Sequence, residues 1–198
     1  MKPKLNVKLL CKEAHDFAKH QSMTDEPSLL SVTDGKAIGT YIEHKFRKSL
    51  SEKYLYEEGN SAQGIDFPGI GVDIKVTSIT QPQSSCPYKS AKQKIYGLGY
   101  SLLVFVYAKT DNHELKAARL KFLHVIYIDK ERTADYQTST GLRRILENGG
   151  NADDLVAFMQ ERFLPVDGIQ AQKIADELLV RKPEIGYLTV SNALQWRL

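Results

Sequence analysis

Hydrophobic residues follow two different spacings along this chain, and the changes of spacing outline its elements. Residues 8–20 and 34–50 carry apolar positions three or four apart, which is typical of amphipathic helices. The polar residues 21–30 are expected to connect these two helices. The run 100–107 is continuously apolar, which predicts a central strand of a sheet, and 119–128 predicts a second strand.

The remainder of the chain is mainly helical in pattern. Further helices are expected at 90–97, 140–147, 152–163 and 168–180. Turn residues cluster around Gly149 and Gly150. We therefore predict an α/β protein with a mixed β-sheet core flanked by helices over residues 1–150, and a helical C-terminal segment over 151–198. This segment either packs on the core only or forms a small DNA-contacting subdomain.

Charged residues interrupt an otherwise apolar segment shortly after the second predicted helix. Asp73 and Lys75 alternate with apolar residues between Val72 and Val76. Residues two apart in a strand point to the same face. We therefore expect the apolar residues to face a core, while Asp73 and Lys75 share the opposite, solvent-facing side.

Turn residues just before this strand predict a hairpin. Pro68-Gly69 is a turn signal, and a hairpin there folds Asp66 back beside Asp73. Two carboxylates can hold a divalent cation, and the Lys75 amine adds a positive charge, an arrangement that suits phosphodiester hydrolysis. A solvated strand face or a surface ion pair, which contributes little, produces the same spacing. The pattern alone leaves both interpretations open.

The distribution of charge is more informative than its total. The 198 residues carry a net charge of +3, which says little about a partner. From Ile74 to Thr110, however, there is no Asp or Glu, although five lysines lie there. They are Lys75, Lys89, Lys92, Lys94 and Lys109. A cationic strip beside paired carboxylates suits a polyanion bound together with a metal ion.

The segment from Asp66 to Lys75 resembles the PD-(D/E)XK nuclease motif, in a form similar to type II restriction endonucleases. The similar region also includes residues 34–39, the run Glu43-His44-Lys45-Phe46, and residues 81–87 and 93–100, so that it covers roughly residues 34–110. The resemblance implies a restriction-endonuclease-like fold and Mg²⁺-dependent cleavage of double-stranded DNA. Two departures exist: Pro68 follows the first acid instead of preceding it, and the second acid is the less common Asp.

The resemblance also implies roles for individual residues. Asp66 and Asp73 match the metal-binding acids and would hold one or two Mg²⁺ ions. Lys75 matches the lysine that orients or deprotonates the attacking water, or stabilises charge on the phosphate. Glu43 would add a carboxylate, directly or through water. The alternative for Glu43 is a solvent-facing ion pair with Arg47, four residues further along the helix.

A second group of residues is expected to contact DNA. Lysines in or just before the helix 90–97 can bind phosphates, and glutamines can make paired hydrogen bonds to adenine. The residues concerned are Lys89, Lys92, Lys94, Gln81, Gln83, Ser84, Ser85 and Gln93. Solvated helix lysines and a solvated loop are the alternatives.

We therefore expect a type II restriction endonuclease. The alternatives are a structure-specific repair or recombination nuclease, and a DNA-binding module on the same fold that no longer cuts. A homodimer is expected because cutting both strands of a palindromic site needs two related active sites.

Other features bear on location. No apolar run is long enough to cross a bilayer, and residues 1–6 contain no apolar signal region. Two cysteines make no disulfide framework, so we expect a cytoplasmic protein without membrane contact.

Overall fold

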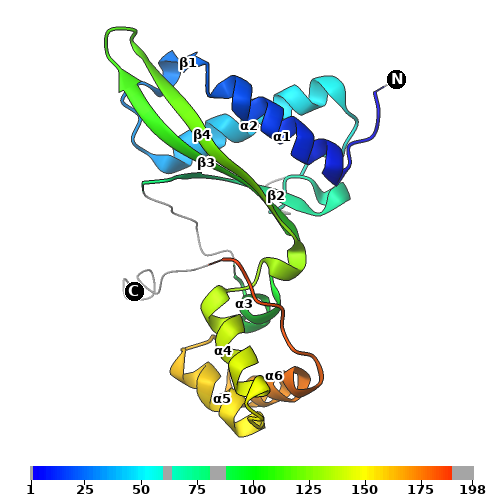
Figure 1. The fold of residues 1–198 in the computed structure, drawn as a ribbon. Helices are drawn as coiled ribbons and strands as arrows, with labels where there is room; N and C mark the ends of the chain where they lie inside the picture. Colours follow the sequence, from blue (N-terminus) through cyan, green and yellow to red (C-terminus); the bar gives the residue numbers. More distant parts are fainter. Residues whose placement is uncertain (1, 60–63, 81–87, 189–198) are drawn as a thin grey trace. The chain divides into compact units, whose positions relative to one another are not determined.

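A computed structural model describes residues 2–59, 64–80 and 88–188 (Figure 1). In these ranges the strands form one four-stranded sheet in the order β1-β4-β3-β2. The strands are β1 Asp25–Glu26, β2 Val72–Ser78, β3 Ser101–Asn112 and β4 Ala117–Ile128. The helices are α1 Val7–Gln21, α2 Gly35–Lys53, α3 Ala91–Tyr96, α4 Tyr136–Glu147, α5 Ala152–Glu161 and α6 Gly168–Val180. The predicted α/β class is confirmed, and β3 is an inner strand as expected.

The chain divides into two compact units. The sheet unit comprises residues 1–84 and 102–127, and the helical unit comprises residues 85–101 and 128–198. The boundary predicted near residue 150 lies inside the helical unit, between α4 and α5. Within the described ranges, no helix combines the length and the apolar character needed to span a bilayer.

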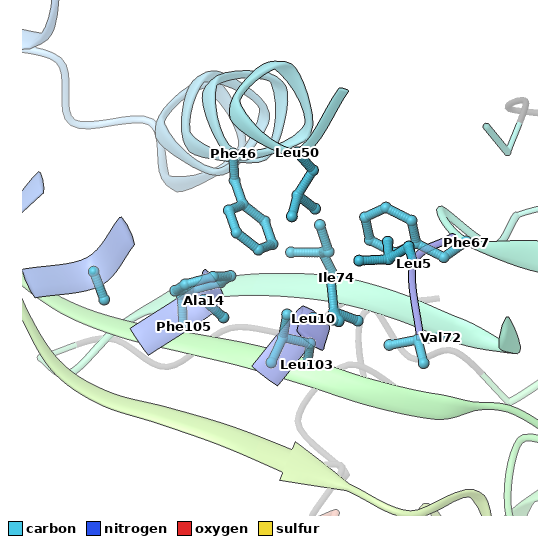
Figure 2. Packing of buried hydrophobic residues seen from close by; sticks show 11 residues of the cluster. Leu5, Leu10, Ala14, Phe46, Leu50, Phe67, Val72, Ile74, Leu103 and Phe105 are labelled. Atoms are coloured by element: carbon cyan, nitrogen blue, oxygen red, sulfur yellow. The ribbon is translucent and has the colours of Figure 1, made fainter. Parts of the chain in front are cut away.

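The core of the sheet unit joins α1 and α2 to strands β2 and β3 (Figure 2). The buried side chains of α2 are Ile38, Ile42, Phe46 and Leu50, at the four-residue spacing of one helix face. Phe46 packs against Phe105 of β3, with ring centroids 5.3 Å apart, and against Phe17 of α1 at 5.1 Å. Burial of each such ring contributes about 1.5–3 kcal/mol. Val72 and Ile74 of the edge strand β2 belong to the same buried cluster, so this core also packs β2 against α2.

The segment 21–30 corrects one expectation. It is not only a polar connector, because Asp25 and Glu26 form β1 and pair antiparallel with Arg119 and Ala118 of β4. The buried Glu26 side chain accepts hydrogen bonds from Gln21, Tyr41 and Lys45. A two-residue strand has no periodicity that a sequence can reveal, and its partner lies more than 90 residues away.

The helical unit has an aliphatic core. Its buried residues include Ile95, Leu142, Leu155, Met159, Ile174 and Leu178. The N-caps of α4, α5 and α6 are Asp135, Asn151 and Asp167, and each side chain accepts a backbone hydrogen bond from the first turn. Capping by Asp135 explains why α4 begins at Tyr136, four residues before the predicted start.

Candidate active site

A tight turn places Asp66 beside strand β2. Phe67 and Val72 exchange two backbone hydrogen bonds of 2.9 and 3.2 Å around a 3₁₀ turn at Pro68–Ile70. Gly71 closes this turn with φ of 63°, a conformation that residues with a side chain rarely adopt. The chain therefore doubles back, as the turn residues predict, and the Ile74 backbone N–H donates a 2.8 Å hydrogen bond to Asp66 Oδ2.

Asp73 and Lys75 lie on β2 and contact each other. The Lys75 Nζ atom is 2.7 Å from Asp73 Oδ2. The side chain of Lys75 is 36% exposed, but that of Asp73 is only 6% exposed. The expectation that Asp73 faces solvent is therefore wrong. Alternation along a strand shows which side chains share a face, but it does not show what covers that face.

The two aspartates influence each other's ionisation. Burial raises the pKa of Asp73 to about 6, the Lys75 ammonium opposes this rise, and the neighbouring Asp66 carboxyl adds to it. Burial also raises the pKa of Asp66; the Ile74 N–H and the contact with Asp73 lower this pKa, and the charge of Glu43 raises it. Two partly desolvated acids in contact favour the binding of a cation.

Arg47 connects Glu43 to this pair. The Arg47 Nη1 atom lies 3.6 Å from Glu43 Oε1 and 3.6 Å from Asp66 Oδ1. The ion pair between Glu43 and Arg47 that the helical spacing suggested is therefore present, and the same guanidinium brings Glu43 to the site. The sequence indicated Arg47 only as a helix partner of Glu43. Its approach to Asp66 depends on the folding of the loop back onto α2, which no spacing reveals.

The donor set suits a cation that keeps part of its water shell. Over the described ranges, no group of three or more His, Cys, Asp or Glu side chains is arranged to hold a metal ion. Asp66 and Asp73 thus make a set of two carboxylates, and Mg²⁺ usually takes one or two carboxylates together with water and substrate phosphates. Within the described ranges, Asp73 Oδ2 is buried without a hydrogen bond of normal geometry, and it lies 2.7 Å from the Lys75 ammonium. These residues fit Mg²⁺.

The residues expected to contact DNA lie elsewhere in the chain. Lys89, Lys92, Gln93 and Lys94 lie in or beside α3 of the helical unit. Gln93 serves the local fold, because its Oε1 accepts a 2.7 Å hydrogen bond from the Lys89 backbone N–H. Lys92 forms an ion pair with Glu177 of α6. Gln81, Gln83, Ser84 and Ser85 lie outside the described residues. Their contact with DNA stays a prediction.

Comparison with known proteins defines the class. A family model described as "Type II restriction enzyme NspV" matches residues 4–198. The chain therefore belongs to this family of type II restriction enzymes, which are site-specific deoxyribonucleases.

One relative is similar over nearly the whole chain. The type II restriction enzyme NspV of Nostoc sp. (strain ATCC 29411 / PCC 7524) is 60% identical over 194 residues, which are 98% of this chain and 88% of the relative. No solved structure matches the chain.

Proposed function

We propose that this type II restriction endonuclease cuts double-stranded DNA at a Mg²⁺-dependent centre formed by Asp66, Asp73 and Lys75. Type II restriction enzymes generally require a divalent cation. The observation that carries the proposal is the hairpin that joins the Asp66 and Asp73 carboxyls, with the Lys75 ammonium 2.7 Å from Asp73.

Each residue has a distinct task in this proposal. Asp66 and Asp73 would hold the cation, which would supply the charge that polarises the phosphate and lowers the pKa of a bound water. The Ile74 N–H keeps Asp66 oriented. Lys75 is exposed enough to reach the substrate, and its N–H groups donate to the attacking water or to the phosphate oxygens. Glu43 adds negative charge beside Asp66, directly or through water.

DNA binding and assembly complete the proposal. Lys89, Lys92 and Lys94 contact phosphates, and the amide and hydroxyl groups of Gln81, Gln83, Ser84, Ser85 and Gln93 contact bases or phosphates. A homodimer supplies one centre for each strand of a palindromic site. Because the substrate is double-stranded DNA, we propose the cytoplasm as the place of action.

The test is a cleavage assay on plasmid DNA with Mg²⁺, and with EDTA as the control. Discrete fragments that form only with Mg²⁺ support the proposal. Smeared products, or nicks on branched DNA, would instead support a structure-specific nuclease. Binding without cleavage in every divalent cation tested would contradict the proposed centre and indicate a binding module.

A further inference from the structure

The Arg47 guanidinium lies near several carboxylates at the edge of the candidate site. The Arg47 guanidinium lies 3.6 Å from an oxygen of Glu43, 3.6 Å from one of Asp66 and 3.6 Å from one of Glu58. These distances exceed those of N–H···O hydrogen bonds, which are about 2.7–3.2 Å. The guanidinium therefore balances the charge of three acids without being locked onto any one of them.

The surrounding structure keeps Arg47 in this place. The Tyr56 hydroxyl donates a 3.0 Å hydrogen bond to the backbone carbonyl of Arg47. Arg47 Nη2 lies 3.5 Å from the Gly59 carbonyl oxygen, and the Gly59 N–H donates to the Asp66 carbonyl at 2.9 Å. The side chain is only 19% exposed. Helix α2 and the chain around Gly59 thus present the guanidinium to Asp66.

This arrangement affects how a metal ion enters. Asp66 Oδ2 accepts the hydrogen bond from Ile74 N–H, and Asp66 Oδ1 faces Arg47. A divalent cation that binds Asp66 therefore approaches a carboxylate already paired with a positive charge. Like charges at such distances repel, and partial burial reduces the screening by solvent.

We propose that Arg47 is the resident counter-cation of the metal-free centre, balancing Asp66 and Glu43 until a divalent cation takes over the pairing with Asp66. This inference rests on the proposed function, because it assumes that Asp66 and Asp73 hold the cation. Arg47 is a positioning residue, because it acts on the metal through the Asp66 carboxylate. It stabilises the protein before metal binds and weakens the binding of the metal itself.

The experiment follows thermal unfolding of the full chain in EDTA and over a Mg²⁺ titration, without DNA. Arg47→Met should lower Tm in EDTA, and the Mg²⁺ concentration for half-maximal stabilisation should fall by about threefold to tenfold because one repelling charge is gone. Arg47→Lys keeps the charge and should stay within about twofold of the wild type. Lys48→Met removes a charge from an exposed neighbour on the same helix and should leave the titration unchanged.

Two results would overturn the inference. One is an Arg47→Met protein that loses the same Tm in EDTA and in saturating Mg²⁺, with the wild-type half-saturation. The other is an Arg47→Met protein that stays unfolded even in saturating Mg²⁺. Failure of the proposed function looks different: the wild type then shows no Mg²⁺ stabilisation, or Asp73→Asn retains all of it.

Discussion

Each unit of this protein buries an aspartate, and the two aspartates have opposite surroundings. Asp135 of the helical unit caps α4, and its Oδ1 accepts a 2.8 Å hydrogen bond from the Thr138 N–H. Asp73 of the sheet unit contacts the ammonium of Lys75 and a second carboxyl, that of Asp66. A carboxylate that caps a helix stabilises a fold, whereas one buried against another acid is typical of a functional site.

The cores of the two units also differ, in how far apart along the chain the elements lie that they join. The rings of Phe17, Phe46, Phe105 and Phe122 pack together in the sheet unit, and they come from α1, α2, β3 and β4. The buried aliphatic residues of the helical unit come largely from α4, α5 and α6, which follow one another in the chain. The candidate site is therefore built on elements that are distant in sequence and packed together through large aromatic rings.

The largest expected effect is the loss of cleavage when the buried Asp73 is replaced, and Asp135 provides the comparison. Asp73→Ala should reduce cleavage by about a thousandfold or more, because a proposed metal ligand is lost. Asp135→Ala should instead lower the free energy of unfolding by about 1 kcal/mol, through loss of the cap, and leave cleavage intact. Plasmid cleavage and urea unfolding measure the two effects. Wild-type cleavage by Asp73→Ala would remove this aspartate from the centre.

Lys75→Ala should reduce cleavage by about a hundredfold or more, while Mg²⁺ still raises Tm. A protonated lysine cannot ligate the cation, so its loss should affect the reaction and spare the metal. Lys109→Ala is the matched control, because Lys109 also forms an ion pair with an aspartate two residues away, Asp111. Equal loss of activity in both variants would show that an ordinary strand ion pair accounts for the effect.

A smaller effect is expected in the helical unit. Replacing Lys89, Lys92 and Lys94 by Ala should flatten the plot of log K against log salt by about two to three units, if each neutralises a phosphate. Binding is measured with Ca²⁺ in place of Mg²⁺. Lys173→Ala, at an exposed position on α6, is the control. An unchanged slope in the triple variant would place the DNA on another face of the protein.

A further effect concerns pH. Burial raises the pKa of Asp73 to about 6 in the folded protein, so the folded state holds this proton more tightly than the unfolded chain. The bound proton therefore contributes to the free energy of unfolding. This contribution is fully present below about pH 4 and is lost as pH rises through 6. In EDTA, the wild type should therefore lose on the order of 2 kcal/mol relative to Asp73→Asn between pH 4 and 7.

Urea unfolding of both proteins at several pH values tests this expectation. Parallel pH profiles would mean that Asp73 has an ordinary pKa. In that case its environment would resemble that of a solvated strand residue, and the contrast with Asp135 would disappear.

The sequence by itself determined the features that depend on near neighbours along the chain. Apolar spacing predicted the helix 168–180 at the bounds of α6, and Pro68-Gly69 predicted the turn that returns Asp66 to β2. The two-residue spacing of Asp73 and Lys75 predicted their shared face, where they now form an ion pair. Such features follow from backbone geometry over a few residues, which a sequence displays directly.

Only the tertiary structure decided the environment of these side chains. The burial of Asp73, the pairing of β1 with β4 and the approach of Arg47 to Asp66 all join segments that are distant in the chain. Alternation gives the direction of a side chain relative to its own strand, whereas solvent exposure and electrostatic potential are sums over every neighbour in space. The pKa of Asp73 is raised by that sum, and the Asp-x-Lys spacing alone does not contain it.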